Sequence, residues 1–156
     1  LIVRQARELG LRQPLMGGDG WDSAKLFEIG GRALDGCYYS NHYSADDPNP
    51  RIQEFVTRFK AKFGAVPDTM AALGFDAGLI AADAMTRATD LTGAAIRDAI
   101  EGTKGFPGVT GVITIDADHN AAKPAVVLMI QGGAAKWVAT VSPDAPSPAP
   151  APAPAK

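Results

Sequence analysis

The segment 50–63 limits how this chain can fold more than any other, because it carries a complete set of signals for an amphipathic helix. Asn49 stands in the cap position, Pro50 in the first helical position and Gly64 just beyond the end. Apolar side chains recur at helical spacing along one stripe: Ile52, Phe55, Val56, Phe59 and Phe63. A stripe of this kind needs to be buried, so the sequence predicts that the helix packs one face on a sheet. Its aromatic residues are expected in the core and not at a ligand.

Helical and extended patterns alternate along the rest of the chain. Apolar periodicity and turn residues predict helices at about 1–9, 23–29, 68–88 and 92–101, and strands at 14–16, 36–40, 109–116, 125–130 and 137–141. The helix at 68–88 is apolar nearly all round, which predicts burial on several sides. Gly132 and Gly133 predict a hairpin between the last two strands. Alternation of this kind predicts an α/β fold.

The composition excludes several classes of partner. A chain of 156 residues that is 46% apolar can bury a core as one domain. Its net charge of −2 and scattered lysines and arginines argue against a nucleic-acid or anionic-membrane partner. No apolar run approaches the length of a membrane span. Cys37 is the only cysteine and lies in an apolar run, so an internal disulfide is excluded and a buried, inert thiol is expected.

The two ends of the chain lead to separate expectations. Residues 1–10 have a helical pattern with neither an initiator Met nor a cap, so we expect a fragment of a longer protein. On this interpretation the missing signal sequence carries no information about the compartment. Residues 142–156 are rich in proline and alanine and have almost nothing to bury, which predicts a disordered tail or spacer.

No metal motif is complete in the sequence. The run 116–120 has the first ligands of a calcium loop, but Ala121 and Val127 stand where a glycine and a bidentate glutamate are required. His42 and His119 lie far apart in the sequence, and neither has a second ligand at metal spacing. We therefore expect neither a metal site nor a cofactor.

Catalytic and nucleotide motifs are incomplete as well. No serine lies in a nucleophile elbow, and the glycines near residue 18 miss the dinucleotide spacing. Asp19 and Asp22 are close enough to act as paired carboxylates, and an enzyme that uses them is a rival interpretation. Either residue can equally be a helix cap, and no nucleophile, base and orienting group come together. The sequence therefore predicts no catalytic residue.

The segment 14–23 points instead to a binding site. An apolar strand runs into Gly17-Gly18-Asp19-Gly20-Trp21, and Asp22 or Ser23 can cap the helix that follows. Ligands of open α/β sheets lie just past the carboxyl ends of strands, so Asp19 is expected to take part in recognition. A lone carboxylate suits the ammonium group of a ligand. The alternative is that Asp19 is only a turn residue that tolerates unusual backbone angles.

Apolar and aromatic residues are the candidates for the rest of the site. Trp21, Tyr43 and Met70 would suit an aliphatic or aromatic ligand side chain, and ordinary packing is the alternative for each. The carboxylate of such a ligand needs hydroxyls or the N–H groups of a helix start. The sequence offers no convincing set of these donors, which fits half a site whose other half lies on a missing lobe.

Several short motifs follow one another between residues 17 and 111, within a similarity that covers roughly residues 1–141. They are Gly17-Gly18-Asp19-Gly20-Trp21, Ser40-Asn41-His42-Tyr43, Phe63-Gly64 with Pro67, Ala71-Ala72-Leu73-Gly74-Phe75-Asp76-Ala77 and Phe106-Pro107-Gly108-Val109-Thr110-Gly111. As an ordered set they resemble the C-terminal part of the periplasmic branched-chain amino-acid (Leu/Ile/Val) binding proteins of bacterial ABC importers. The resemblance implies a type I periplasmic-binding-protein-like lobe, an open parallel sheet flanked by helices with a C-terminal β-hairpin. Residues 1–141 would be the C-terminal lobe of a two-lobe protein, with its last crossover and hairpin.

The resemblance also implies roles for two residues. The position that matches Asp19 binds the α-ammonium group of the ligand, and the position that matches Met70 lines the side-chain pocket. Trp21 and Tyr43 are added from the local argument alone. Well-known members carry Glu at the first position and often an aromatic residue at the second. These departures leave a bulkier amino acid or an amide open as ligand.

The function implied is that of the solute-binding component of an ABC importer, which captures a branched-chain or other apolar amino acid between two lobes. The partners are then the amino-acid ligand and the ABC permease in the membrane, and the location is the periplasm, with the signal sequence outside this fragment. No catalytic activity is expected. One alternative is a cytoplasmic sensor of a small amide with the same fold, which a signal sequence before residue 1 would exclude. Another is that the fragment alone binds nothing because half of the cleft is missing.

Overall fold

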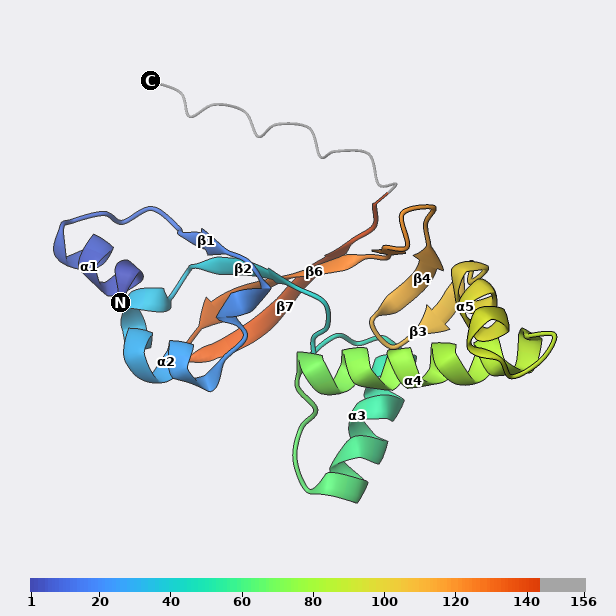
Figure 1. Ribbon diagram of the computed structural model, residues 1–156. Coiled ribbons are helices and arrows are strands. Elements are labelled where there is room, and N and C mark those ends of the chain that lie inside the picture. The colour runs from blue at the N-terminus through green and yellow to red at the C-terminus, as the bar shows by residue number, and fades with distance from the viewer. Residues whose placement is uncertain (144–156) are drawn as a thin grey trace.

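The computed structural model describes residues 1–143 and has a mixed α/β architecture (Figure 1). The elements in chain order are α1 (Ile2–Glu8), β1 (Met16–Gly17), α2 (Ala24–Gly30), β2 (Tyr38–Asn41), α3 (Pro50–Phe63), α4 (Thr69–Arg87), α5 (Gly93–Glu101), β3 (Phe106–Gly108), β4 (Gly111–Ile115), β5 (Ala121–Ala122), β6 (Ala125–Gln131) and β7 (Ala134–Val141). The predicted α/β class is confirmed. The tail predicted at 142–156 lies, from residue 144 on, outside the described residues.

The larger sheet has four strands in the order β1-β2-β6-β7. Only β1 and β2 pair in parallel, and β6 runs antiparallel to both β2 and β7. The predicted hairpin at Gly132 and Gly133 is confirmed, with φ angles of 59° and 78° at the two positions. Positive φ at both central residues gives a turn whose twist matches that of the flanking strands. The sheet is therefore mixed, with a parallel first pair and an antiparallel hairpin at its other edge.

The smaller sheet, β3-β4-β5, shows that the single strand predicted for 109–116 was wrong. The chain reverses at Val109 and Thr110, between β3 and β4, and Gly111 follows with a φ of 113°. The carboxylate of Asp76 in α4 accepts hydrogen bonds from the N–H groups of Val109 (2.7 Å) and Thr110 (2.8 Å). This buried acceptor comes from a distant part of the chain, so the local pattern did not reveal the reversal.

The helices begin and end close to where the sequence places them. α3 runs from Pro50 to Phe63 as predicted, with the Asn49 side chain accepting a hydrogen bond from the Arg51 N–H and Gly64 in the left-handed conformation. Of the alternatives left open by the sequence, Ser23 caps α2 and Asp68 caps α4. The caps fix where each helix starts and hence the direction in which its first turn points.

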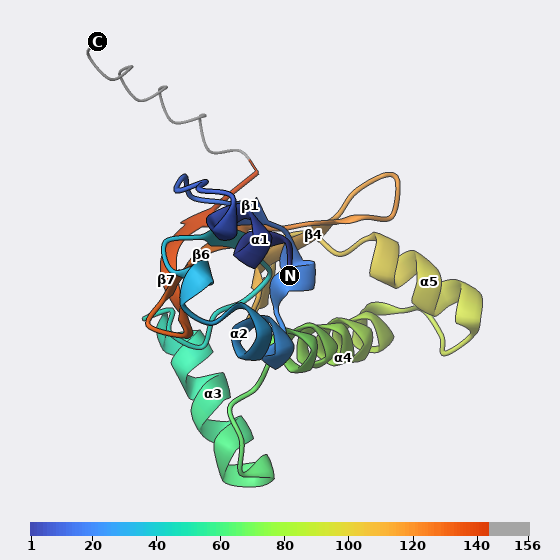
Figure 2. The same cartoon turned by 90° about the vertical axis from the view of Figure 1, so that its left-hand side faces the viewer.

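The surroundings of α3 and α4 differ from the prediction. The α3 stripe packs against Tyr43, Ala72 and Val109 and not on the face of a sheet, and Phe63 at its end is 60% exposed. α4 is not buried on several sides, because Phe75, Leu79 and other apolar residues on it are exposed. The two helices diverge from one another in both views (Figures 1 and 2). Helical periodicity predicts which face is apolar but not what covers that face.

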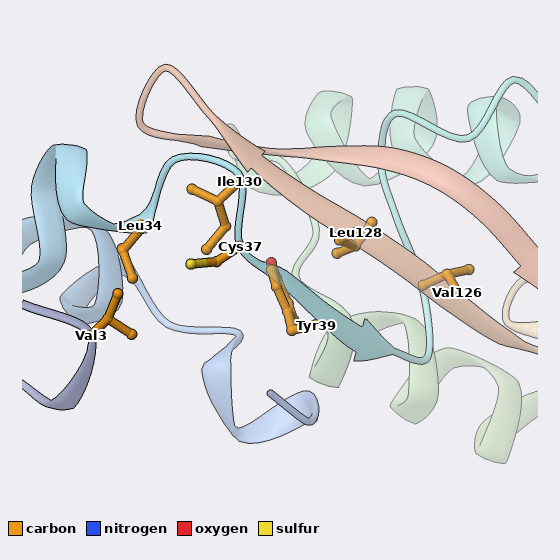
Figure 3. Packing of buried hydrophobic residues seen from close by; sticks show 7 residues of the cluster. All are labelled: Val3, Leu34, Cys37, Tyr39, Val126, Leu128 and Ile130. Atoms are coloured by element: carbon orange, nitrogen blue, oxygen red, sulfur yellow. The ribbon is translucent and has the colours of Figure 1, made fainter. Parts of the chain in front are cut away.

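The described residues form two units, each with a hydrophobic core of its own. The sheet unit consists of α1, α2 and the four-stranded sheet, and its core contains Val3, Leu34, Cys37, Tyr39, Val126, Leu128 and Ile130 (Figure 3). The helix unit consists of α3, α4, α5 and the small sheet, and its core contains Tyr43, Ile52, Phe55, Val56, Ala72 and Val109. All the closely packed pairs of elements fall within one unit or the other.

The chain passes between the units twice. The first crossing, residues 42–49, leads from β2 to α3, and the second, residues 123–124, leads from β5 to β6. The units lie on opposite sides of these crossings (Figure 1). No helix within residues 1–143 combines the length and the apolar character needed to cross a membrane.

Candidate ligand-binding site

A small pocket of about 170 Å³ lies at the junction of the two units. The sheet unit contributes side chains from β2, β6 and β7 to its lining, and the helix unit contributes the start of α4. The polar lining residues include Asp22, Tyr39, Asn41, Tyr43, Asp68 and Thr69. Movement of one unit relative to the other would change the shape of this pocket, since both units line it.

The lining is acidic. Asp22, Asp46 and Asp68 contribute carboxylates, and no lysine, arginine or histidine lines the pocket. Asp46 is paired with Lys136 at 3.2 Å, and Asp68 accepts the N–H of Ala71 at the start of α4. The pocket therefore favours a cationic group over an anionic one.

Two tyrosines of the lining have buried hydroxyl groups. Within residues 1–143, neither the Tyr39 hydroxyl nor the Tyr43 hydroxyl has a hydrogen-bond partner. Burial, and to a smaller degree the Asp22 carboxylate, raises the pKa of Tyr39 to about 12. Burial, followed by the Asp68 carboxylate, raises the pKa of Tyr43 to about 12. Both phenols therefore stay neutral well above neutral pH.

Asp19 lies at the carboxyl end of β1, in a single 3₁₀ turn formed by Asp19–Trp21. Its side chain is 60% exposed, and its Oδ2 lies 3.1 Å from Nε2 of His42. His42 directly follows β2, so the ends of the two parallel strands bring the pair together. Asp19 is at the strand end where the sequence predicts it, but it does not line the pocket. An exposed pair of this kind contributes little to stability.

The other three predicted site residues lie in different surroundings. The Trp21 ring lies so close to Gly17 that a Cβ there would be 2.2 Å from it, and it packs against the core of the sheet unit. Tyr43 lines the pocket and is 3% exposed. Met70 is 71% exposed and follows Thr69, which lines the pocket. The structure thus brings Tyr43 and the neighbour of Met70 to the junction, while Trp21 packs within one unit.

Sequence reasoning missed several residues of this junction. Tyr39 and Asn41 come from β2 and were given no site role in the sequence analysis. Asp22 was considered as a cap or as a catalytic partner of Asp19, and Asp68 only as a cap. A signal was present, because residues at strand ends and helix starts face the same edge of an open sheet. His42 was weighed only as a metal ligand, although it follows a strand just as Asp19 does.

The predictions about metals and the cysteine concern residues that the structure describes. Among these residues, no three His, Cys, Asp or Glu side chains are grouped so that they could hold a metal ion. The run 116–120 forms a turn in which Asp116 accepts the N–H groups of Asp118 and Asn120. Cys37 is a buried free cysteine, which confirms the predicted burial of this thiol.

Comparisons with known proteins give one family and many similar folds. The family model described as "Periplasmic binding protein" matches residues 1–135. No curated protein sequence matches the chain. A crystal structure of the leucine-binding protein LivK of Thermotoga maritima is 38% identical over 92% of this chain, with a TM-score of 0.82.

Two further solved structures are similar. The branched-chain amino acid transporter substrate-binding protein LivJ of Streptococcus pneumoniae, in complex with isoleucine, is 32% identical over 88% of the chain, with a TM-score of 0.73. A solute-binding protein of Rhodopseudomonas palustris in complex with benzoate is 24% identical over 92% of the chain, with a TM-score of 0.68, and shows the likeness of the fold alone. The chain covers 41% of LivK, 40% of LivJ and 41% of the R. palustris protein, well under half of each.

Proposed function

Since the chain belongs to the periplasmic binding protein family, as the match over residues 1–135 shows, we propose that it is part of the solute-binding component of an ABC importer whose ligand is an apolar amino acid. The similarity to a leucine-binding protein and to a protein solved with isoleucine supports this ligand class. The partners are then the amino acid and the ABC permease, and the location is the periplasm. The protein captures its ligand and does not transform it.

The observation that carries the proposal is the carboxylate at the end of β1. Asp19 is held in a turn directly past a parallel strand, beside the residue that follows the neighbouring strand. This is the edge at which open α/β sheets bind ligands. A carboxylate there accepts charge-assisted hydrogen bonds from an ammonium group. Met70 and Tyr43 are proposed to line the region that holds the side chain of the ligand. Trp21 is proposed to support the turn that carries Asp19.

We also propose a division of the chain between two lobes. The sequence predicts that residues 1–141 form one lobe, but the two separate cores support assigning the sheet unit to one lobe and the helix unit to the other. The crossings at 42–49 and 123–124 would then connect the lobes. The apolar faces left exposed on α3 and α4 would pack against the remainder of the helix unit's lobe, because relatives are more than twice as long as this chain.

Ligand capture follows from this division. A ligand that touches both lobes binds better when they are closed, and it shifts the equilibrium only by this difference in affinity. Asp19 would bind the ammonium group from the sheet unit, while the start of α4 would approach the ligand from the other side. Closure would bury the ammonium–carboxylate pair and exclude water, which strengthens the interaction.

The test is calorimetric titration of the longer protein that contains this chain with leucine, isoleucine and valine. Asp19→Ala is expected to weaken binding by about 2–5 kcal/mol, the cost of removing one partner of a buried charge pair. Asp83→Asn is the matched control, because Asp83 pairs with Arg87 on the side of α4 that contacts α5, away from the junction.

Each outcome decides a separate point. If the wild-type protein binds no amino acid, the proposed ligand class is wrong, and binding of acetamide in its place would favour the amide sensor. If the wild-type protein binds leucine and Asp19→Ala binds it equally well, Asp19 is not in the site.

A further inference from the structure

The second crossing contains a lysine that contacts three different segments of the chain. The ammonium nitrogen of Lys123 lies 3.3 Å from the carbonyl oxygen of Thr110 in the β3–β4 turn. It lies 3.5 Å from the carbonyl oxygen of His42 in the first crossing and 3.5 Å from that of Pro124 in the second. One side chain therefore joins both crossings to the helix unit.

The charge of Lys123 is held among carbonyl dipoles and not in an ion pair. Within the described part of the chain, no carboxylate oxygen lies within 4.0 Å of its ammonium group. The contacts of 3.3 to 3.5 Å are longer than ordinary N–H···O hydrogen bonds, so each of them is weak. Weak contacts of this kind would allow the movement between the units that the proposed function requires.

The helix-unit side of this contact is rigid. Asp76 in α4 is 2% exposed and accepts three hydrogen bonds from Val109 and Thr110, the residues of the β3–β4 turn. The carbonyl oxygen of Thr110 that faces Lys123 is thereby fixed to α4. Burial lowers the pKa of Lys123, and the nearby Asp76 carboxylate acts in the opposite direction.

The sheet-unit side of the contact leads to the proposed binding site. The backbone of His42 faces Lys123, while its ring nitrogen lies 3.1 Å from the Asp19 carboxylate. Contacts therefore run without a break from Asp19 through His42 and Lys123 to the turn fixed by Asp76. The helix that carries Asp76 also carries Met70 on its first turn.

We propose that Lys123 is a positioning residue that holds His42, and through it Asp19, in register with the helix unit. This inference rests on the proposed function, because it assigns Asp19 to ligand binding. Lys123 itself touches no ligand. It makes the orientation of the Asp19 carboxylate depend on how the helix unit is seated, so that the two sides of the site move together.

A double-mutant cycle tests the proposal, with leucine affinity of the longer protein as the measurement. Lys123→Met and His42→Ala are each expected to weaken binding on the order of tenfold, the range found for residues that couple without touching ligand. Both changes interrupt the same series of contacts between Asp19 and the helix unit. The double variant should therefore bind leucine no more weakly than whichever single variant has the lower affinity. A purely structural role for Lys123 would make the two effects add.

Two further variants serve as controls. Lys104→Met removes a lysine that also binds a backbone carbonyl oxygen, that of Ile115, but within the helix unit, and it should leave the affinity unchanged. Lys123→Arg keeps the positive charge and is expected to restore part of the lost affinity. Circular dichroism melting of each variant verifies that it is folded.

The outcomes separate this inference from the proposed function. If the wild-type protein binds leucine and the two effects add, Lys123 does not act through His42 and the inference is overturned. If Lys123→Met does not fold, the test rests on His42→Ala, which is expected to fold because the His42 side chain is partly exposed. An unchanged leucine affinity of His42→Ala would then overturn the inference. If the wild-type protein does not bind any amino acid, it is the proposed function that fails.

Discussion

The cores of the two units are completed to different degrees. In the sheet unit Leu34, Cys37 and Ile130 have no exposed surface, and the paired strands β2 and β6 lie far apart in the sequence. In the helix unit Phe63, Phe75 and Leu79 stay exposed along a groove of about 890 Å³ between α3 and α4. The difference teaches that regular, well-capped helices do not by themselves make a closed core. The core of the sheet unit is closed, whereas the helix unit leaves apolar side chains of α3 and α4 exposed.

The largest expected effect tests whether the helix unit depends on one buried carboxylate. Asp76→Ala removes the acceptor of three hydrogen bonds at a site that is 2% exposed. We expect it to lower the free energy of unfolding of the helix unit by about 3–5 kcal/mol, since buried donors lose their partner. Urea unfolding, followed by the circular dichroism signal of the helices, measures this change in the free energy of unfolding.

The matched change in the sheet unit is Asp35→Ala. Asp35 likewise accepts a backbone N–H at a turn, that of Gly132 at 3.0 Å, but in an exposed position. It is expected to cost at most about 1 kcal/mol. Equal losses for Asp76→Ala and Asp35→Ala would show that burial does not distinguish the two turns.

An intermediate effect compares the buried tyrosines, one in each core. The pKa of Tyr39 and that of Tyr43 are raised to about 12, from an ordinary value near 10. Between about pH 10 and 12 the folded state therefore holds phenolic protons that the unfolded chain releases. The contribution of each tyrosine to folding stability is fully present below about pH 10 and is lost as the pH rises towards 12. Each tyrosine is expected to contribute a loss of about 2–3 kcal/mol across this window.

Phenylalanine substitutions assign the alkaline loss to a core. Tyr39→Phe should flatten the pH dependence of the sheet unit, and Tyr43→Phe that of the helix unit, in unfolding measured between about pH 9 and 12. The hydroxyls make no hydrogen bond to the described residues, so the substitutions should cost little at neutral pH. An unchanged alkaline loss in both variants would mean that these phenols do not cause it.

The smallest expected effect concerns the helix caps. Asn49→Ala removes the cap of α3 in the helix unit, and Ser23→Ala removes that of α2 in the sheet unit. Each should lower stability by about 1 kcal/mol in thermal or urea unfolding. Because one flank of α3 is open, removal of its cap should also speed hydrogen exchange at the amides of residues 51–53. Equal protection in the variant and the wild type there would contradict this.

Local structure was predictable where the residues themselves carry the cause. The bounds of α3 follow from Asn49, Pro50 and Gly64, and the last hairpin follows from two glycines. The β3–β4 reversal was not predictable, because its cause is Asp76, more than thirty positions earlier. The environment of α4 was not predictable either, since an apolar surface looks the same in a sequence whether or not it is covered.

The candidate site was predictable only in part, for a similar reason. Asp19 was predicted as a site residue because strand, turn and carboxylate are contiguous in the sequence, and the structure has it at that strand end. Its neighbour His42 comes from the end of another strand, and Lys123 reaches the same place from a third segment. Contacts between distant segments depend on the order of the strands and on the crossings between the units, which a local sequence pattern does not contain.

The single thiol of the chain has a practical consequence. Cys37 lies in the innermost layer of one unit only (Figure 3), so a thiol-specific dye in solution reaches it only when that unit opens. The labelling rate therefore measures how often the sheet unit opens and is insensitive to opening of the helix unit. Local unfolding of the sheet unit can thus be followed in the natural sequence, without an introduced cysteine.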